Sequence, residues 1–305
     1  MSTITTGNFP KALRSDMKVW WDNATKEYTP EWPDLFNKTS SSMSYEQLGE
    51  ITSFGLVPVK PEGTDSQFDT ETQGTITTAT HSSYSLGFKV THEDILFNQY
   101  RKVGKQRTQR LAFSFRQTKE TVLANIYNRA HNGSYTFGDG SAMCVTTHTT
   151  LNGTQSNTLS SAADMSETSI EDIIIQIGQA KNSRGLQLKL IAKSLIVPIN
   201  LQFEAQRIVK STLQNDTANN AINAINSMGM FPEGIKVNHY LTDVDSFFMR
   251  TDVPSDQGMV LFQAEELNFD QDNDFPSKDM CYRGAEIYVA TMGDFRAVYS
   301  NGGGA

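Results

Sequence analysis

The most constraining feature of the sequence is a threonine-rich stretch that favours a β-strand but has almost no apolar face. It reads Gly74-Thr-Ile-Thr-Thr-Ala-Thr-His-Ser-Ser-Tyr84 and lies within a segment, 45–90, that Gly and Pro punctuate. Hydroxyl-bearing and β-branched residues favour extended backbone, but a strand without an apolar face gains little by packing inside its own domain. An isolated hairpin is marginal in water. We therefore expect 45–90 to form an extended β-hairpin loop that leaves the body of the protein and lies on another chain.

A long helix is expected after this segment. Thr91, followed by His92, Glu93 and Asp94, combines an N-capping hydroxyl with acids that suit the positive end of a helix dipole. Apolar residues then recur at helical spacing, at Leu111, Phe115, Val122, Ile126 and Ala130, and Asn132-Gly133 supplies a stop. The pattern predicts a helix over 105–131, roughly 40 Å long at 1.5 Å per residue, with Gly104 as an interruption before it.

The first 44 residues are polar, yet they contain all three tryptophans of the chain. One interpretation is a disordered tail, but disordered segments are usually poor in aromatic residues. The other is an arm whose aromatic side chains anchor on a neighbouring subunit, since Trp and Tyr are favoured interface anchors. We prefer the arm. Its candidate interface residues are Trp20, Trp21, Trp32 and Phe36.

The remainder alternates helices and strands and then becomes strand-rich. A capping pattern at Ser166 opens a helix to about 181. A strand at 195–199, a helix at 201–213, a helical piece at 218–226 and a strand at 235–241 follow. Further strands are expected at 246–250, 259–263, 267–270, 285–290 and 295–299. The fold class is therefore α+β, without an internal repeat.

Charge is distributed unevenly along the chain. A net charge of −8 excludes a protein whose whole surface embraces nucleic acid. Residues 101–131 nevertheless carry eight Lys/Arg against one acid, and 252–279 carry eight acids against one Lys. Both could be solvated faces, both could meet between subunits, or the basic face could contact DNA phosphates. Arg107, Arg110 and Arg116 are the interface candidates on the basic helix.

No pattern of catalytic or metal-binding residues emerges. GxSxG, GxxxxGK[ST], GxGxxG after a strand and HExxH are all absent. Cys144 and His148 are four residues apart, but their surroundings predict loop and strand rather than the helix that would pair them. Asp270, Asp272 and Asp274 open a calcium-like spacing, which fails because Phe275 and Cys281 stand where Gly and Glu are needed. We predict no enzyme activity, no catalytic residue, no metal and no cofactor.

The compartment also follows from what is missing. The two cysteines, Cys144 and Cys281, have no disulfide or zinc spacing, which is typical of a reducing cytoplasm. The N-terminus has no signal-peptide pattern, and no apolar run approaches the length of a membrane span.

One stretch resembles a known family. It comprises Ala124-Asn-Ile-Tyr-Asn-Arg-Ala-His-Asn-Gly133, then Phe137-Gly-Asp-Gly-Ser-Ala-Met-Cys-Val-Thr-Thr-His148, and closes with Leu151-Asn-Gly153. This is similar to the major head subunits of tailed phages, in particular the Mu-like group. The order of expected elements also resembles their HK97-like capsid fold, which has an N-terminal arm, an extended β-hairpin loop, a long spine helix, a peripheral domain and an axial domain.

The resemblance implies a domain map and a function. The map assigns an N-terminal arm (1–44), an extended loop (45–90), a peripheral domain (91–190, with the spine helix at 105–131 and strands at 256–290) and an axial domain (191–255, with 291–305 as its final strand and the C-terminal tail). Such subunits form hexamers and pentamers that tile an icosahedral head enclosing double-stranded DNA, in virions assembled in the bacterial cytoplasm.

The resemblance also implies partners. Met1 stands directly before the arm, so we expect a separate scaffolding protein rather than a fused one. A portal is a further expected partner, a decoration protein is left open, contact with packaged DNA would be non-specific, and no membrane is involved. The alternatives are another phage structural protein, of the decoration or tail type, and a Cys/His-dependent hydrolase.

Overall fold

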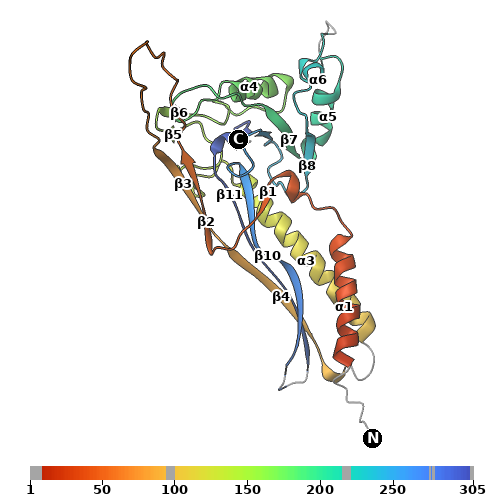
Figure 1. Cartoon of the computed structure of the whole chain (residues 1–305). Coiled ribbons are helices and arrows are strands. Elements are labelled where there is room, and N and C mark those ends of the chain that lie inside the picture. The colour runs from red at the N-terminus through yellow and green to blue at the C-terminus, as the bar shows by residue number, and fades with distance from the viewer. Residues whose placement is uncertain (1–8, 94–99, 215–220, 275, 277–278, 303–305) are drawn as a thin grey trace.

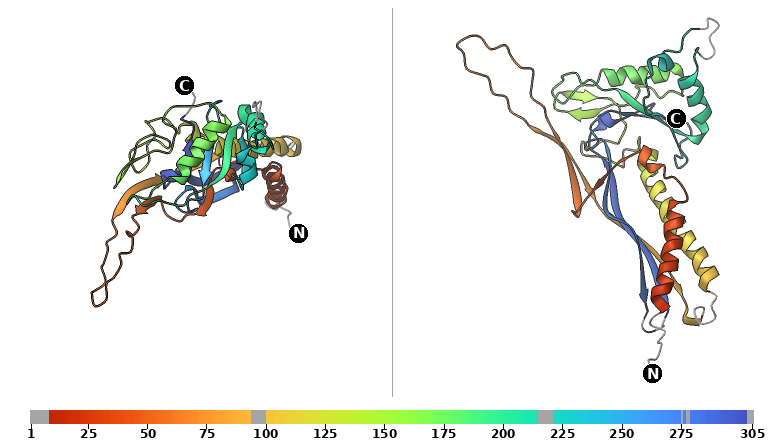
Figure 2. Two further views of the ribbon diagram at one scale, coloured as in Figure 1. Left: turned by 90° about the horizontal axis from the view of Figure 1, so that it is seen from above. Right: turned by 45° about the vertical axis from the view of Figure 1, so that its right-hand side comes forward.

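Two sheets and a projecting hairpin organise the chain in a computed structural model that describes residues 9–93, 100–214, 221–274, 276 and 279–302 (Figure 1). A long, twisted sheet carries two helices on one side, a smaller sheet carries three shorter helices, and the hairpin extends away from both (Figure 2). The α+β class expected from the sequence is confirmed. No helix in the described ranges is long and apolar enough to cross a membrane.

The long sheet has the strand order β1-β10-β11-β4. Its strands are β1 (Asn37–Ser40), β10 (Met259–Asn273), β11 (Met280–Met292) and β4 (Ser82–Val90). β1 pairs parallel with β10, and the other neighbours are antiparallel. The strands predicted at 259–263 and 267–270 are one strand, whose register shifts between these two parts. Bulges at these register shifts let the backbone continue as one strand.

The spine helix is α3 (Tyr100–Asn128), which confirms the long helix predicted for this region. It starts earlier than expected and runs through Gly104 without a break. A β-carbon at Gly104 would lie 2.3 Å from the Met17 Cε atom of helix α1 (Phe9–Lys26). The glycine therefore permits close contact between two helices that lie side by side along the sheet (Figure 1), rather than marking an interruption.

The aromatic side chains of the arm pack largely on their own chain rather than remaining free for a neighbour. Trp21 and Phe36 are only 3% and 2% exposed, and both are buried in the chain's own core. Trp21 stacks on Phe269 with ring centroids 4.9 Å apart, and Phe36 meets Tyr127 edge-on at 5.8 Å. Trp20 and Trp32 are partly buried against the same chain. The prediction that these residues anchor on a neighbour is wrong for Trp21 and Phe36, because α1 and the 3-10 helix η2 (Trp32–Asp34) already place them against the sheet and α3.

The smaller sheet has the order β12-β9-β7-β8. Its strands are β7 (Ala192–Pro198), β8 (Gly234–Asn238), β9 (Phe248–Thr251) and β12 (Val298–Ser300). Its helices are α4 (Glu167–Gly178), α5 (Gln202–Lys210) and α6 (Ala224–Met228), and the short 3-10 helices η3 (Ile199–Leu201) and η4 (Phe295–Ala297) flank it. The helical piece predicted at 218–226 lies partly outside the described residues.

Helix α4 begins at the capping box expected around Ser166. Its buried residues Ile170, Ile173 and Ile177 pack with Leu195 and Val197 of the small sheet. The assignment of 91–190 to one domain with the spine helix is therefore wrong for α4, because its apolar face is buried on the other sheet. A separate core joins the two sheets and is formed by residues of the arm, α3 and both sheets, among them Phe36, Tyr127, Ile196, Phe248 and Leu261.

The hairpin consists of β2 (Tyr45–Ile51) and β3 (Gln73–Thr80), paired antiparallel. The predicted extended loop of 45–90 is thus shorter, because β4 turns at His81 and joins the long sheet. Thr77 and Ala79 are buried at the base of β3, so the threonine-rich strand packs partly on its own chain. A small hairpin of β5 (His148–Thr150) and β6 (Gly153–Gln155) lies nearby.

Candidate assembly surfaces

The Cys144 and His148 pair does not form a catalytic site. Cys144 is buried in the core that joins the sheets, and burial raises the pKa of its thiol far above the usual range, so the thiol stays neutral. A neutral, enclosed thiol is a poor nucleophile. The hydrolase interpretation is therefore not supported by the geometry of these residues.

His148 instead holds the loop that follows the spine helix. Its Nδ1 lies 2.5 Å from Asp139 Oδ2 and its Nε2 lies 3.0 Å from Asn157 Oδ1. The ring stacks on Phe295 at 4.2 Å, and the side chain is fully buried. Asn157 in turn donates to the carbonyls of Met143, Phe295 and Val298. Much of the stretch that resembles phage head subunits thus forms a buried hydrogen-bond network next to β12.

Of the three aspartates with calcium-like spacing, Asp270 and Asp272 lie in β10 and Asp274 follows its end, and two of the three pair with cations. Asp270 lies 3.7 Å from Arg283 Nη2, and Asp274 lies 2.8 Å from Lys89 Nζ. Within the described ranges no group of three His, Cys, Asp or Glu side chains is arranged to hold a metal ion.

The tip of the hairpin is the most exposed apolar part of the described chain. Residues 52–72 join β2 to β3 as an extended loop that reaches away from the body (Figure 2). The loop exposes Phe54 (56%), Leu56 (81%), Val57 (94%), Val59 (94%) and Phe68 (97%). Exposed apolar side chains in such number mark a contact surface in soluble proteins.

Polar contacts tie the hairpin to the body. Arg184 pairs with Asp69 and also donates to the Thr70 carbonyl. The hydrogen bond from the Gly55 backbone, together with Arg184, lowers the pKa of Asp69 to about 2. Asn182 donates to Ser53 across 2.9 Å. The loop is thus positioned by charged and polar groups, while its apolar side chains remain uncovered.

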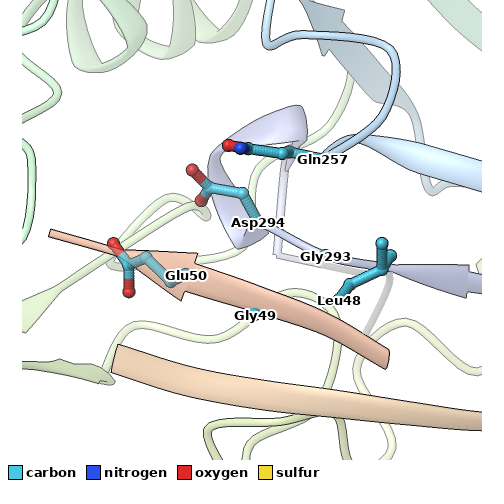
Figure 3. Close-up of a pocket in the computed structure, with 6 residues that line it drawn as sticks. All are labelled: Leu48, Gly49, Glu50, Gln257, Gly293 and Asp294. Atoms are coloured by element: carbon cyan, nitrogen blue, oxygen red, sulfur yellow. The ribbon is translucent and has the colours of Figure 1, made fainter. Parts of the chain in front are cut away.

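A buried arginine lies at the base of the hairpin. Arg296 is 2% exposed, and its Nη1 lies 3.0 Å from Asp294 Oδ1 and 3.5 Å from Glu50 Oε1. Figure 3 shows the small pocket at this junction, with Leu48, Gly49 and Glu50 of β2 on one side and Gln257, Gly293 and Asp294 of the body on the other. A β-carbon at Gly293 would lie 2.6 Å from the Gln257 carbonyl oxygen, so this close approach requires glycine.

The three basic interface candidates on α3 have different surroundings. Arg107 donates to the Lys89 carbonyl at 3.0 Å and so ties α3 to the end of β4. Arg116 lies over the Tyr28 ring at 4.5 Å. Arg110 and Arg116 line a groove between α1 and α3. The structure thus brings Arg110 and Arg116 together and sets Arg107 apart from them.

Sequence reasoning missed a buried ion pair between the spine helix and the long sheet. Lys119 Nζ lies 3.1 Å from Glu286 Oε2 and 2.7 Å from Gln263 Oε1, and Glu286 is 2% exposed. The same ammonium lies 4.7 Å from the centre of the Tyr288 ring. The only signal in the sequence was a glutamate at the inward phase of an otherwise apolar strand, which gives no hint of its partner.

The part of the chain built on the smaller sheet also exposes apolar side chains, around α5 and α6. Phe203 is 74% exposed, Ile222 71% and Met228 67%. Helices α5 and α6 lie at the end of the molecule opposite α1 (Figure 1). They form a second candidate contact surface.

Comparison with known proteins gives one family and one fold. The family model described as "Phage capsid protein" matches residues 74–301. No curated protein matches the chain in sequence.

The fold recurs in solved structures, two of them of capsids and one of a phage, that share little sequence with the chain. The capsid of the empty GTA particle is 8% identical, with a TM-score of 0.53, and the match covers 90% of this chain and 89% of that one. The capsid of the cyanophage P-SCSP1u is 9% identical with a TM-score of 0.53, covering 89% and 87%. A Microbacterium phage Oxtober96 structure is 7% identical with a TM-score of 0.51, covering 90% of each chain. The HK97-like fold expected from the sequence is confirmed.

Proposed function

The chain belongs to the phage capsid protein family and is a major capsid protein of a head shell; from this premise we propose that its copies assemble as hexamers and pentamers into an icosahedral shell that encloses double-stranded DNA. The role is structural, without a catalytic step.

The observation that carries this proposal is the projecting loop 52–72. Its five large apolar side chains are 56% to 97% exposed. Burying such side chains stabilises an assembly by about 25 cal/mol per Å² of apolar surface. A subunit that displays them on an extended loop is suited to covering a neighbour, and in a shell every copy has one.

The two sheets support distinct positions in a capsomer. We assign the smaller sheet, with α4, α5 and α6, to the axial position, where Phe203, Ile222 and Met228 would meet equivalent surfaces of other copies. The long sheet with α1 and α3 takes the peripheral position. This revises the map expected from the sequence, since α4 moves to the axial unit.

The further partners rest on the family rather than on geometry. We propose a separate scaffolding protein, a portal and non-specific contact with packaged DNA, with assembly in the host cytoplasm and the virion as destination. A decoration protein stays open. We also propose the Mu-like group as the subgroup, on the strength of the stretch from Ala124 to Gly153.

Electron microscopy of the purified chain tests the proposal directly. We expect closed particles or rings of capsomer size under conditions that favour association. Amide exchange at 52–72 should be fast in free subunits and slow in particles. A chain that stays monomeric under all such conditions, with unchanged exchange in the loop, would contradict the proposal.

A further inference from the structure

A short turn, residues 182–186, follows helix α4 and is closed by its own hydrogen bonds. The side-chain oxygen of Asn182 accepts from the backbone N–H groups of Arg184 at 3.0 Å and Leu186 at 2.8 Å. The N–H group of Asn182 donates to the Leu186 carbonyl at 2.8 Å. Gly185 has a φ of 82°, which glycine adopts without strain. The shape of the turn is therefore set by local contacts.

A buried arginine anchors this turn to the body. The Nε atom of Arg296 donates to the carbonyl of Lys181, directly before the turn, at 2.8 Å. The Nη1 atom of the same side chain pairs with Asp294 and with Glu50 of β2. The start of the turn and the base of the hairpin thus share one buried cation, which fixes the turn relative to the body.

Both limbs of the projecting loop are attached to the turn. On the limb that leaves β2, the Asn182 amide donates to the Ser53 hydroxyl at 2.9 Å. On the limb that returns to β3, the Arg184 guanidinium pairs with Asp69 through one nitrogen and donates to the Thr70 carbonyl through another. The turn therefore holds the loop from both sides at the point where the loop leaves the body.

The two limbs are also tied to each other close to the turn. Asp69 Oδ2 accepts from the Gly55 N–H group at 2.8 Å, and the Thr52 hydroxyl donates to the Thr72 carbonyl at 2.9 Å. Farther out, no group in 56–68 forms a hydrogen bond or ion pair with a described residue outside the loop. The direction of the apolar tip therefore depends on the contacts of the limbs with the turn (Figure 2).

We propose that Arg184 is a positioning residue for assembly: through Asp69 and Thr70 it directs the loop 52–72 in the free subunit, before a neighbour is present. A subunit whose loop already has the competent direction associates without first losing that freedom. A loop without this contact binds more weakly, by the fraction of molecules that hold the competent direction. The proposal rests on the proposed shell function and concerns how readily copies associate.

The chemistry of the contact suits a loop that is directed first and adjusts later. The guanidinium fork reaches a carboxylate and a carbonyl at once, which a lysine ammonium does less well. The side chains of Arg184 and Asp69 are 25% and 44% exposed, so water can replace either partner when the loop shifts against a neighbour. Arg184 therefore sets the initial direction of the loop without fixing its final one.

Distances between spin labels in free subunits test the first half of the proposal. In a Cys281→Ser background, Val59→Cys on the loop and Asp172→Cys on α4 carry the labels, because both positions are exposed. Cys144 is buried and stays unlabelled. The wild-type arginine should give a narrow distance distribution, since the limbs are held at the turn.

Removing the guanidinium should widen that distribution. Arg184→Gln should about double its width, because a loop that has lost its local contacts samples more directions. Asp69→Ala should act in the same sense, and since it lies in the loop it leaves the body intact. Arg283→Gln is the matched control, because it breaks another exposed Arg–Asp pair, with Asp270 of the long sheet, and should leave the width unchanged.

Assembly kinetics test the second half. Light scattering should show assembly of Arg184→Gln slowed about tenfold, as expected when about a tenth of the loops hold the competent direction. The midpoint of urea unfolding and the size of the finished particles should stay those of the wild type. Arg184→Lys should recover part of the rate, because the ammonium keeps the charge but not the fork.

Two results would overturn the positioning role while leaving the shell function standing. One is an unchanged distance distribution in both Arg184→Gln and Asp69→Ala, and the other is a widened distribution with a wild-type rate of assembly. Failure of the wild-type chain to form particles would count against the shell itself, and the distances in free subunits would still decide whether Arg184 directs the loop.

Discussion

Replacing Lys119 by Met should lower the free energy of unfolding, because the buried carboxylate of Glu286 loses its cation. Glu286 is 2% exposed, and its carboxylate has the Lys119 ammonium as a cation at 3.1 Å. Burial raises the pKa of Glu286, and Lys119 opposes that rise. Methionine conserves most of the volume, so the main loss is the charge. A buried charge that loses its partner typically costs about 3–5 kcal/mol.

Proton uptake limits that cost in this case. Without Lys119 the Glu286 carboxyl can take up a proton, and the free energy of protonation at a given pH is set by its ordinary pKa of 4.5. At pH 7 the pH exceeds this pKa by 2.5 units, and at about 1.36 kcal/mol per unit the electrostatic destabilisation is limited to about 3.4 kcal/mol. The electrostatic part of the loss should therefore be about 2–3 kcal/mol at pH 7. At pH 5 the limit falls to about 0.7 kcal/mol.

The sign of the pH dependence follows from the same carboxyl. Its pKa is raised in the folded state, so the folded variant binds a proton more tightly than the unfolded chain. The penalty is absent below the unfolded pKa and grows as pH rises through the folded one. The free energy of unfolding of the variant should thus lie closer to that of the wild type at pH 5 than at pH 7.

Urea unfolding of unassembled subunits measures this, with tryptophan fluorescence as the probe. Adding Glu286→Gln to Lys119→Met removes the titrating group and should abolish the pH dependence of the deficit. Lys105→Met, an exposed change on the same helix, should stay within about 0.5 kcal/mol of wild type. A Lys119→Met deficit that is equal at pH 5 and pH 7 would refute the reasoning.

Four further expectations concern the core and the hairpin. Arg296→Met should destabilise the subunit by about 2–4 kcal/mol and raise protease sensitivity at 45–80, because two carboxylates lose their cation. Gly284→Ala should cost about 1–3 kcal/mol in urea unfolding, because the new β-carbon would lie 2.6 Å from a Phe115 ring atom. Deleting residues 1–36 should yield insoluble chain rather than a folded subunit, and a cooperative unfolding transition would contradict this. Subunit stability should fall as pH drops below 6.5, since burial lowers the pKa of His131 and the unfolded chain takes up the proton first; His131→Gln should flatten that fall.

Elements with a strong local period could be predicted from the sequence. The spine helix and α4 carry regular apolar spacing or a capping box, and both occur where expected. Strand β7 is a short continuous apolar run, and it is buried in the small sheet. In each case the information lies within a window of a few residues, which is the range over which propensity and periodicity act.

The errors arose where the deciding contact is distant in sequence. The polar composition of 1–44 concealed that α1 would pack on α3, because the reason is Gly104, about ninety residues away. The partner of α4 is a strand that follows it, while its position in the chain had suggested the spine helix. Lys119 and Glu286 are 167 residues apart. Only the packed structure makes such pairs adjacent.

The distribution of apolar and polar contacts has a consequence for how the subunit moves. Around α3 the contacts are mainly aromatic and aliphatic, with Trp21, Phe115 and Tyr127 buried. Where the hairpin loop meets the body the contact is ionic, through Arg184 and Asp69, whose side chains are 25% and 44% exposed. Apolar cores resist displacement because any shift opens a void, whereas half-exposed ion pairs can exchange partners with water at a cost of about 1 kcal/mol. The hairpin should therefore take its final direction from the neighbour it contacts, while the two sheets keep theirs.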